Sequence, residues 1–359
     1  MKKIILILVL FITFNSNVYA SVNSASSYIL MDAKTGRVLL SKDKDNSMLI
    51  ASITKIMTSI IVLENTSIDN IVTVDDSILK SYGSGIYIQI GEEISVKDLL
   101  YGLMLRSGND AAIMLATYIS GSEEEFVKLM NEKAKELHMT NTTFNNSSGL
   151  DENKGNYSTT YDMALLTKYA MNNKIFMEIV GTKSYVTKTN FKSYSWTNKN
   201  KLLKYDFITG GKTGYTEKAK RTLVTTANIN NMDLIVVTIR DSDDWNTHLD
   251  LYNYAEENYI AYKVLNKSKF KIENDTYFNG TFYIKNDIYI PFKKEETGSL
   301  ISHIKLYKTK NYQDNDVIGE NQILYKNKVI YTEPIYIKTE VPKEKKTFFD
   351  KIRKWFKND

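Results

Sequence analysis

The spacing of apolar residues predicts helices in the first half of the chain. Apolar positions recur every three to four residues, as on one face of a helix, in five segments. These segments are 52–63, 96–105, 110–118, 123–137 and 161–171. Strand patterns flank them, as a hairpin over 28–41 and as strands at 223–227 and 234–239. Strands at both ends of a helical stretch predict one mixed sheet in an α/β fold.

The pattern changes near residue 265, where short runs rich in Tyr, Ile and Phe replace the helical spacing. The predicted strands are 276–283, 288–292, 304–307, 323–325 and 328–331. We expect Lys326 and Asn327 to form a tight turn between the last two strands. The sequence therefore predicts a main domain over 21–265 and a small all-β domain over 266–340.

Both ends of the chain carry segments that we expect to lie outside these domains. Two lysines precede an uncharged apolar run, which predicts a signal peptide over 1–20 that is cleaved after Ala20. An uncleaved anchor is the alternative. In the tail 341–359, aromatic and aliphatic residues alternate at helical spacing with Lys and Arg over 345–357. This pattern predicts a basic amphipathic helix on an anionic membrane surface, with packing on the β domain as the alternative.

The composition limits the chemistry that the protein can perform. With 43% hydrophobic and 25% charged residues among 359, the chain suits a globular protein and fits neither disorder nor a membrane bundle. A net charge of +5 gives no nucleic-acid footprint. The absence of cysteine excludes disulfides and thiol chemistry, and three scattered histidines offer little for a zinc site. We expect no metal and no cofactor.

Ser52 and Lys55 lie three residues apart at the start of a predicted apolar helix, and therefore on one face of it. Free backbone N–H groups at a helix N-terminus can stabilise an oxyanion, and a desolvated, neutral lysine can take a hydroxyl proton. The pair predicts a nucleophile that needs no histidine. Alone, Ser-x-x-Lys is a weak signal, because most such serines cap helices.

Two further polar segments could complete such a site. Ser107 and Asn109 interrupt an apolar stretch, and either side chain could instead cap the helix that follows. The segment 209–216 is rich in glycine, which allows a ligand backbone to approach closely. Within it, Lys212 and Thr213 could hold a carboxylate. The alternative is a glycine-rich turn that leads into a strand.

The three motifs occur in the order Ser-x-x-Lys, Ser-x-Asn and Lys-Thr-Gly. Ser107 lies 55 positions after Ser52, and Lys212 lies 105 positions after Ser107. In this order they resemble the motifs of the penicillin-binding and serine β-lactamase superfamily. The segments 28–36, 149–164 and 198–203 extend the resemblance to the low-molecular-mass D-alanyl-D-alanine carboxypeptidases over 27–262. The resemblance implies a β-lactamase/transpeptidase-like fold, in which a mostly antiparallel sheet is flanked by helices and joined to a helical lobe.

The resemblance implies a serine-type carboxypeptidase that removes the terminal D-alanine from peptidoglycan stem pentapeptides through an acyl-enzyme on Ser52. Lys55 would be the general base, and Ser107 would relay a proton to the departing D-alanine. A free lysine has a pKa of about 10.4. Lys55 can serve as a base near neutral pH only if that value is lowered, which we expect burial and the charge of Lys212 to cause.

The implied substrate-binding residues are Asn109, Lys212, Thr213, Gly214 and Tyr215. By this resemblance Asn109 would hold the substrate amide, while Lys212 and Thr213 would meet the terminal carboxylate. The backbone N–H groups of the nucleophile and of Tyr215 would form the oxyanion hole. The implied partners are stem peptides that end in D-Ala-D-Ala, with β-lactam antibiotics as covalent inhibitors. Export would place the protein at the outer face of the cytoplasmic membrane or in the cell wall, with a secreted fraction as the alternative.

The sequence departs from the family pattern at two places near the expected substrate. Residues 219–221, Ala-Lys-Arg, stand where many relatives have a glycine. Many relatives also carry an arginine soon after the strand expected at 234–239, and this arginine helps to bind the substrate carboxylate. Here that position falls near Thr247 and His248. Arg240 and His248 are the candidates to replace it, and weaker binding of the substrate is the alternative.

Three other functions are alternatives to a carboxypeptidase. A class A β-lactamase needs a glutamate that activates water, and we find no convincing Glu-x-x-x-Asn element between Asn109 and Lys212, so slow deacylation of penicillin is expected. A DD-endopeptidase or transpeptidase would use the same residues, because the shape of the groove selects the acceptor. A non-catalytic cell-wall-binding protein with the same fold is the alternative of another class.

Overall fold

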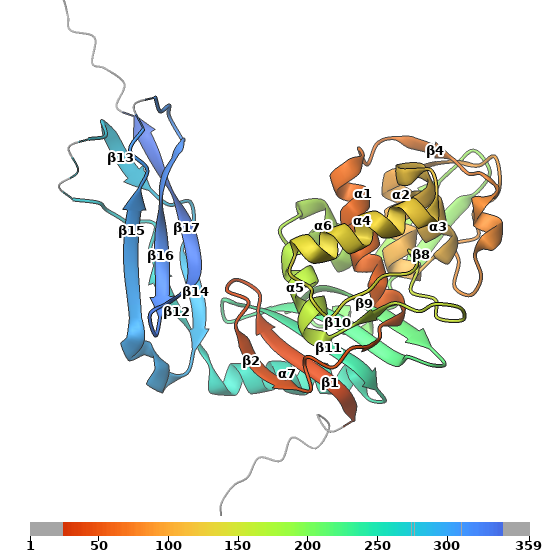
Figure 1. Ribbon diagram of the computed structural model, residues 1–359, viewed down its shortest axis with the longest axis horizontal. Coiled ribbons are helices and arrows are strands. Elements are labelled where there is room, and N and C mark those ends of the chain that lie inside the picture. The colour runs from red at the N-terminus through yellow and green to blue at the C-terminus, as the bar shows by residue number, and fades with distance from the viewer. Residues whose placement is uncertain (1–23, 274, 276, 310, 340–359) are drawn as a thin grey trace, which may run out of the picture. The chain divides into compact units, whose positions relative to one another are not determined.

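The computed structural model describes residues 24–339 except 274, 276 and 310 (Figure 1). The expected signal peptide and tail helix lie outside the described residues. The chain forms two compact units. The first contains the chain up to Met31, Val38–Ala227 and Leu234–Ala255, and the second contains Asp32–Arg37, Asn228–Asp233 and the chain from Glu256.

A five-stranded sheet organises the first unit, in the order β2-β1-β11-β10-β9. Its strands are β1 (Ala25–Asp32), β2 (Val38–Lys42), β9 (Ile208–Thr216), β10 (Lys220–Ile229) and β11 (Met232–Asp241). Strands β1 and β11 lie side by side, so the sheet joins both ends of the unit as expected, and the α/β class is confirmed. Both β1–β2 and β9–β10 pair in antiparallel fashion. Strand β9, which carries the Lys-Thr-Gly motif, lies at an edge of the sheet.

A helical lobe lies on one side of this sheet (Figure 1). It contains η2 (Ala51–Thr54), α1 (Lys55–Asn65), η3 (Asp76–Lys80), α2 (Val96–Tyr101), η4 (Gly102–Arg106), α3 (Asn109–Ser120), α4 (Glu123–Glu136), α5 (Thr160–Ala170), α6 (Lys174–Gly181) and η5 (Lys201–Lys204). All five predicted helices are present. The first opens with a 3-10 turn, η2, and the second closes with a π-helical turn, η4.

Short two-stranded ladders complete the lobe. They pair β3 (Met48–Leu49) with β6 (Tyr157–Ser158), β4 (Ile71–Thr73) with β5 (Glu93–Ser95), and β7 (Ser184–Lys188) with β8 (Ser193–Thr197). The sequence patterns did not predict these ladders, nor the helices α6 and α7 (Asp244–Asn258). In the part of the chain that the structure describes, no helix combines the length and the apolar character that a membrane span requires.

Helix α7 covers the face of the sheet opposite the lobe (Figure 1). His248 on this helix is fully buried, with Nδ1 2.7 Å from Thr225 Oγ1 and Nε2 3.1 Å from Thr238 Oγ1. Burial lowers the pKa of His248 to about 3, so the ring is neutral at physiological pH. The buried face of α7 is thus partly polar, which explains why the spacing of apolar residues did not reveal this helix.

The second unit is rich in strands. It contains β12 (Ile260–Leu265), β13 (Gly280–Tyr283), β14 (Ile288–Phe292), β15 (Leu300–Leu306), β16 (Val317–Tyr325), β17 (Lys328–Thr339) and the 3-10 turn η6 (Lys294–Ser299). Strands β13-β17-β16-β15 form one sheet, and β12 pairs with β14. Isoleucine and phenylalanine side chains fill its two core clusters. Lys326 and Asn327 have φ angles of 49° and 63°, so the tight turn predicted there is confirmed.

The turn that carries Ser52 is held by close backbone contact with a distant loop. Ala51 has a φ of 48°, a left-handed conformation that is costly for a residue with a side chain. Gly149, with a φ of 89°, packs directly against it. A Cβ atom at Gly149 would lie 2.0 Å from the Ala51 carbonyl oxygen. Glycine is therefore required at this position by both space and backbone conformation.

We expect Gly149→Ala to destabilise the protein strongly and to displace Ser52. Gly121→Ala is the matched control, because Gly121 also has a left-handed φ of 78° but no atom within 4 Å of the added Cβ. The control should cost about 1–2 kcal/mol from backbone strain. Gly149→Ala should cost about 1–3 kcal/mol more because of the collision. Thermal unfolding measures both, and equal losses would contradict this account.

Candidate active site

The structure brings Ser52 and Lys55 together where η2 meets α1. Lys55 Nζ lies 3.1 Å from Ser52 Oγ. Neither η2 nor α1 has a side-chain cap, so Ser52 does not perform the capping role that such serines commonly have. Its hydroxyl is instead directed to the lysine and to an open cavity.

Lys55 is completely buried, and its amine is surrounded by oxygen atoms. Nζ lies 2.7 Å from Asn109 Oδ1 and 2.5 Å from the Ser148 carbonyl oxygen. Burial and the charge of Lys199 together lower the pKa of Lys55 to about 7, while Asp110 opposes the shift. The expectation of burial was right, and Lys199 adds a neighbouring charge that the sequence analysis did not name. A neutral amine has two N–H donors for the two carbonyl oxygens and a lone pair left for the Ser52 hydroxyl.

The Ser-x-Asn motif follows the π-helical turn η4. Ser107 has a φ of 64°, and Gly108, which lacks a side chain, occupies the N-cap of α3, so neither Ser107 nor Asn109 caps that helix. The Asn109 amide donates to the Tyr82 carbonyl oxygen at 2.6 Å and accepts from Lys55. This unusual backbone turn directs both side chains of the motif into the site.

Lys212 lies beneath the cavity, with 1% of its surface exposed. Its Nζ is 3.2 Å from Ser107 Oγ and donates to the Thr213 carbonyl oxygen at 2.6 Å. Burial lowers the pKa of Lys212 well below its usual range, and the charges of Lys55 and Lys199 add to this effect. Two amines buried this close together cannot both be charged without a large free-energy cost.

Gly214 allows the edge strand β9 to lie against the nucleophile. A Cβ atom at Gly214 would be 2.9 Å from the Ser52 backbone nitrogen and 2.3 Å from Thr222 Oγ1. Thr222 in turn donates to the Ile50 carbonyl oxygen at 2.9 Å, which ties β10 to the turn before Ser52. The backbone of β9 is thereby held next to the start of η2.

A cavity of about 320 Å³ opens over these residues. Its walls include Ser52, Ser107, Thr213, Gly214, Tyr215 and Lys199. All eight residues that the sequence singled out therefore lie in or directly beneath one site. Lys199 was not among them, although it belongs to the segment 198–203 on which part of the family resemblance rests. Its Nζ contacts Ser84 Oγ at 3.2 Å, across the cavity wall.

The two candidates to replace the family arginine were both wrong. His248 is buried between β10 and β11, as described above, and does not line the cavity. Arg240 donates to the Lys218 carbonyl oxygen and lines a different cavity, next to Leu49 and Tyr157. The arginine that lines the cavity of Ser52 is Arg221.

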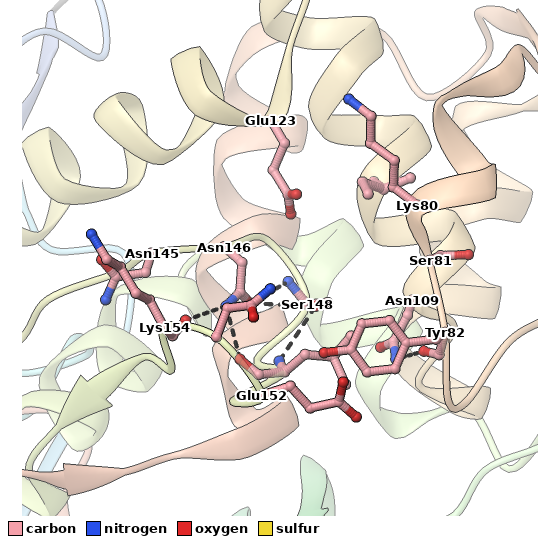
Figure 2. Close-up of a pocket in the computed structure, with 13 residues that line it drawn as sticks. Lys80, Ser81, Tyr82, Asn109, Glu123, Asn145, Asn146, Ser148, Glu152 and Lys154 are labelled. Carbon is pink, nitrogen blue, oxygen red and sulfur yellow. Dashed lines mark hydrogen bonds between the residues drawn. The ribbon is translucent and has the colours of Figure 1, made fainter.

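A second cavity, of about 350 Å³, adjoins the residues that hold Lys55 (Figure 2). Asn109 and Ser148 form part of its wall. Figure 2 shows how Asn146 fixes this wall, because its amide donates to the Leu150 and Lys154 carbonyl oxygens. Asn146 Oδ1 also accepts from the Gly149 N–H. The Ser148 carbonyl is thus held in place opposite the Lys55 amine.

One Glu-x-x-x-Asn spacing does occur in this loop, at Glu152 and Asn156. Glu152 is exposed and lies beside Tyr82 (Figure 2), while the Asn156 amide donates to Thr54 Oγ1 and to the Asn146 carbonyl oxygen. Neither side chain contacts Ser52 or Lys55, so the spacing does not create a water-activating glutamate. Among the described residues, no cluster of three or more acidic or histidine side chains could hold a metal ion.

Comparison with known proteins agrees with this geometry. A family model described as D-alanyl-D-alanine carboxypeptidase matches residues 15–243. The chain belongs to this family. A second model, described as the C-terminal domain of penicillin-binding protein 5, matches residues 263–343. The resemblance inferred from the three motifs is confirmed.

Individual relatives support the same assignment. The D-alanyl-D-alanine carboxypeptidase DacF of Bacillus subtilis is 40% identical over 222 residues, and DacC of Escherichia coli is 37% identical over 233. These alignments cover 60% and 61% of this chain and 57% of each relative. The structure of penicillin-binding protein 5 from Haemophilus influenzae superposes with a TM-score of 0.67 at 27% identity, over 88% of this chain and 97% of that one.

Lys55 should make the free energy of unfolding depend on pH. Its pKa is about 7 in the folded protein and 10.5 in its ordinary environment, so between these values the unfolded chain binds more protons and stability rises with pH. We expect the free energy of unfolding of the wild type, minus that of Lys55→Met, to rise by up to about 1.4 kcal/mol per pH unit in this window.

Urea unfolding of both proteins at about pH 7.5 and about pH 9.5 measures this difference. Lys128→Met is the control, because the Lys128 side chain is 65% exposed and lies outside the site. It should show no comparable slope. A wild-type-minus-Lys55→Met difference that stays constant with pH would contradict the lowered pKa.

Proposed function

We propose that the protein is a serine-type D-Ala-D-Ala carboxypeptidase that removes the terminal D-alanine from peptidoglycan stem pentapeptides. One observation carries the proposal: the buried Lys55 amine, whose pKa is lowered to about 7, lies 3.1 Å from Ser52 Oγ. A neutral amine at this distance can take the hydroxyl proton as the oxygen attacks. Membership of the family supports the substrate class.

In the first half of the reaction, Ser52 Oγ attacks the carbonyl carbon of the penultimate D-alanine while Lys55 Nζ accepts the hydroxyl proton. Collapse of the tetrahedral intermediate breaks the peptide C–N bond, and the departing nitrogen needs a proton. The proton that Lys55 accepted passes through Ser107 Oγ, which lies 3.2 Å from Lys212 Nζ, to this nitrogen, so that Lys55 is neutral again. In the second half, water attacks the ester with Lys55 again as base, which releases the tetrapeptide and restores Ser52.

The substrate is held by groups that already surround the nucleophile. The backbone N–H groups of Ser52 and Tyr215 form the oxyanion hole, and Gly214 gives the substrate backbone access to it. An amide has two N–H donors, and Asn109 uses one for Tyr82, so the other is available for the substrate. Thr213 in the cavity wall contacts the terminal carboxylate. Lys212, buried beneath, would offer that carboxylate an N–H donor.

The surroundings of Lys55 favour a carboxypeptidase over a β-lactamase. The hydrogen-bond partners of Lys55 Nζ are a hydroxyl, an amide oxygen and a backbone carbonyl, with no carboxylate among them. Among the described residues, Lys55 is therefore the base that we expect to activate the deacylating water. We therefore propose that β-lactam antibiotics act as covalent inhibitors that leave slowly. Endopeptidase and transpeptidase reactions would pass through the same ester with other amines.

We also propose how the chain is organised in the cell. Residues 1–20 act as a signal peptide, and the catalytic domain 21–265 acts outside the cytoplasm, at the membrane or in the cell wall. The β domain 266–340, which overlaps the match to a penicillin-binding protein C-terminal domain, links it to the tail 341–359. The basic pattern of 345–357 supports contact with an anionic membrane surface.

A pentapeptide that ends in D-Ala-D-Ala tests the proposed function. The wild type should release free D-alanine, and Ser52→Ala should lower the rate at least about 10³-fold, because it removes the nucleophile. Ser59→Ala is the matched control: Ser59 lies on α1, which follows the turn of Ser52, and among the described residues its buried hydroxyl has no partner. It should retain full activity.

Two outcomes would contradict the proposal. If the wild type cleaves crosslinked peptides and releases no D-alanine from the pentapeptide, the enzyme is an endopeptidase. If Ser52→Ala releases D-alanine at the wild-type rate, Ser52 is not the nucleophile.

A further inference from the structure

Arg221 lines the cavity of Ser52, although no sequence motif pointed to it as a functional residue. Two cationic residues line this cavity, Lys199 and Arg221. Burial and the charge of Arg106 lower the pKa of Lys199, whereas a guanidinium keeps its charge at any physiological pH. A substrate with a free terminal carboxylate needs a stable positive partner on the side where its last residue lies. Arg221 is the residue that can supply it.

The pairing of β9 with β10 places Arg221 beside the Lys-Thr-Gly motif. Arg221 lies directly opposite Tyr215, and no irregularity interrupts the ladder there. Residues opposite each other in an antiparallel pair share a face of the sheet, as do residues two apart on one strand. Arg221, Tyr215 and Thr213 therefore share a face at the open edge of the sheet. Arg221 and Thr213 both line the cavity of Ser52.

Two consecutive residues at the start of α7 hold the guanidinium in place. Asp244, whose side chain is 3% exposed, forms an ion pair with Arg221 Nη2. The Trp245 ring lies under the guanidinium, with its centroid 5.2 Å from Arg221 Cζ. Contacts on two sides reduce the conformational entropy that Arg221 would lose on binding a ligand. Both Asp244 and Trp245 themselves line the cavity.

The ion pair leaves donors of Arg221 for a ligand. A guanidinium has five N–H groups in a planar fork, and the bond to Asp244 Oδ1 uses one nitrogen, Nη2. Nε is buried and out of reach, so the donors that remain for a ligand are N–H groups of Nη1 and Nη2. The Arg221 side chain as a whole is still 38% exposed, so a ligand in the cavity can reach it. A carboxylate matches two parallel donors of such a fork.

We propose that Arg221, positioned by Asp244 and Trp245, binds the terminal carboxylate of the substrate and gives the site its preference for peptides with a free C-terminus. The inference rests on the proposed carboxypeptidase function. In many relatives we expect an arginine after the strand that corresponds to β11 to contact this carboxylate. Here the contact is assigned to Arg221 of β10. In this chain that segment offers Thr247 and His248, which are both fully buried.

A role for Arg221 in binding the carboxylate also accounts for the second departure from the family pattern, the Ala-Lys-Arg sequence at 219–221. Lys220 has a φ of 61°, a left-handed conformation that glycine adopts at lower cost, which explains a glycine here in relatives. The left-handed residue lies at the start of β10, immediately before Arg221. The segment 219–221 thus keeps the turn while it places an arginine at the first position that faces the cavity.

A pair of substrates measures the preference for a carboxylate. The two are a peptide that ends in D-Ala-D-Ala and its C-terminal amide, compared by kcat/KM. We expect Arg221→Gln to lower kcat/KM for the acid about 10- to 100-fold, mainly through KM, and to leave the amide within about threefold, as for the loss of a charged hydrogen bond. For Arg221→Lys, kcat/KM for the acid should lie between the values of the wild type and Arg221→Gln, because lysine keeps the charge but lacks the planar pair of donors. Asp244→Asn should reduce the same acid-to-amide ratio.

Arg240→Gln is the matched control, because it removes an equal charge from the next strand outside the cavity. It should leave both substrates unchanged. If Arg221→Gln does not alter the ratio of kcat/KM for the acid to kcat/KM for the amide, the inference is overturned. The proposed function is tested separately, by release of D-alanine from the wild type. A fall with Arg240→Gln equal to that with Arg221→Gln would also overturn it, because the effect would then be one of net charge. If Arg221→Gln does not fold, the Arg221→Lys and Asp244→Asn ratios decide in the same way.

Discussion

Lys55 buries its amine completely, and none of its described hydrogen-bond partners is a carboxylate that would offset the loss of water around a charge. An ammonium group in this place is costly, and the neutral amine is favoured. The Asn109 and Ser148 oxygens take its two N–H donors, so that its lone pair is left for the Ser52 hydroxyl. Burial of the Lys55 amine thus favours its neutral form, and its two oxygen partners orient it toward Ser52.

Backbone conformations that are themselves costly maintain this burial. Ala51 and Ser107 both adopt left-handed φ angles, and each precedes or carries a reacting hydroxyl. Gly149 and Gly214 allow a loop and a strand to approach the same turn more closely than any side chain would permit. The strain and the buried amine lower the stability of the lobe locally, and the packed core of helices and sheet around them makes up the difference.

The sequence predicted the parts of the site that depend on local geometry. The spacing of Ser52 and Lys55 on one helix required only the helical repeat, and the order of three motifs was enough to identify the family. The Ser148 carbonyl is 93 residues from Lys55, and Asp244 is 23 residues from Arg221, so no local pattern could show these contacts. The places of Lys199 and Arg221 in the cavity wall depend on which strands and loops meet near β9. Helix α7 was missed for a related reason, because its buried His248 and Tyr252 are satisfied by threonines of the sheet.

The pH dependence of Ser52 acylation tests the neutral-lysine account most directly. The measurement is the second-order rate constant for labelling by a fluorescent penicillin between about pH 5 and about pH 10, with intact-protein mass spectrometry to identify the adduct. The account predicts a rate that rises with pH through an inflection near about 7 and then stays level, because the base acts when Lys55 has lost its proton. A rate that is independent of pH, or that rises only near the ordinary lysine value of 10.5, would contradict it.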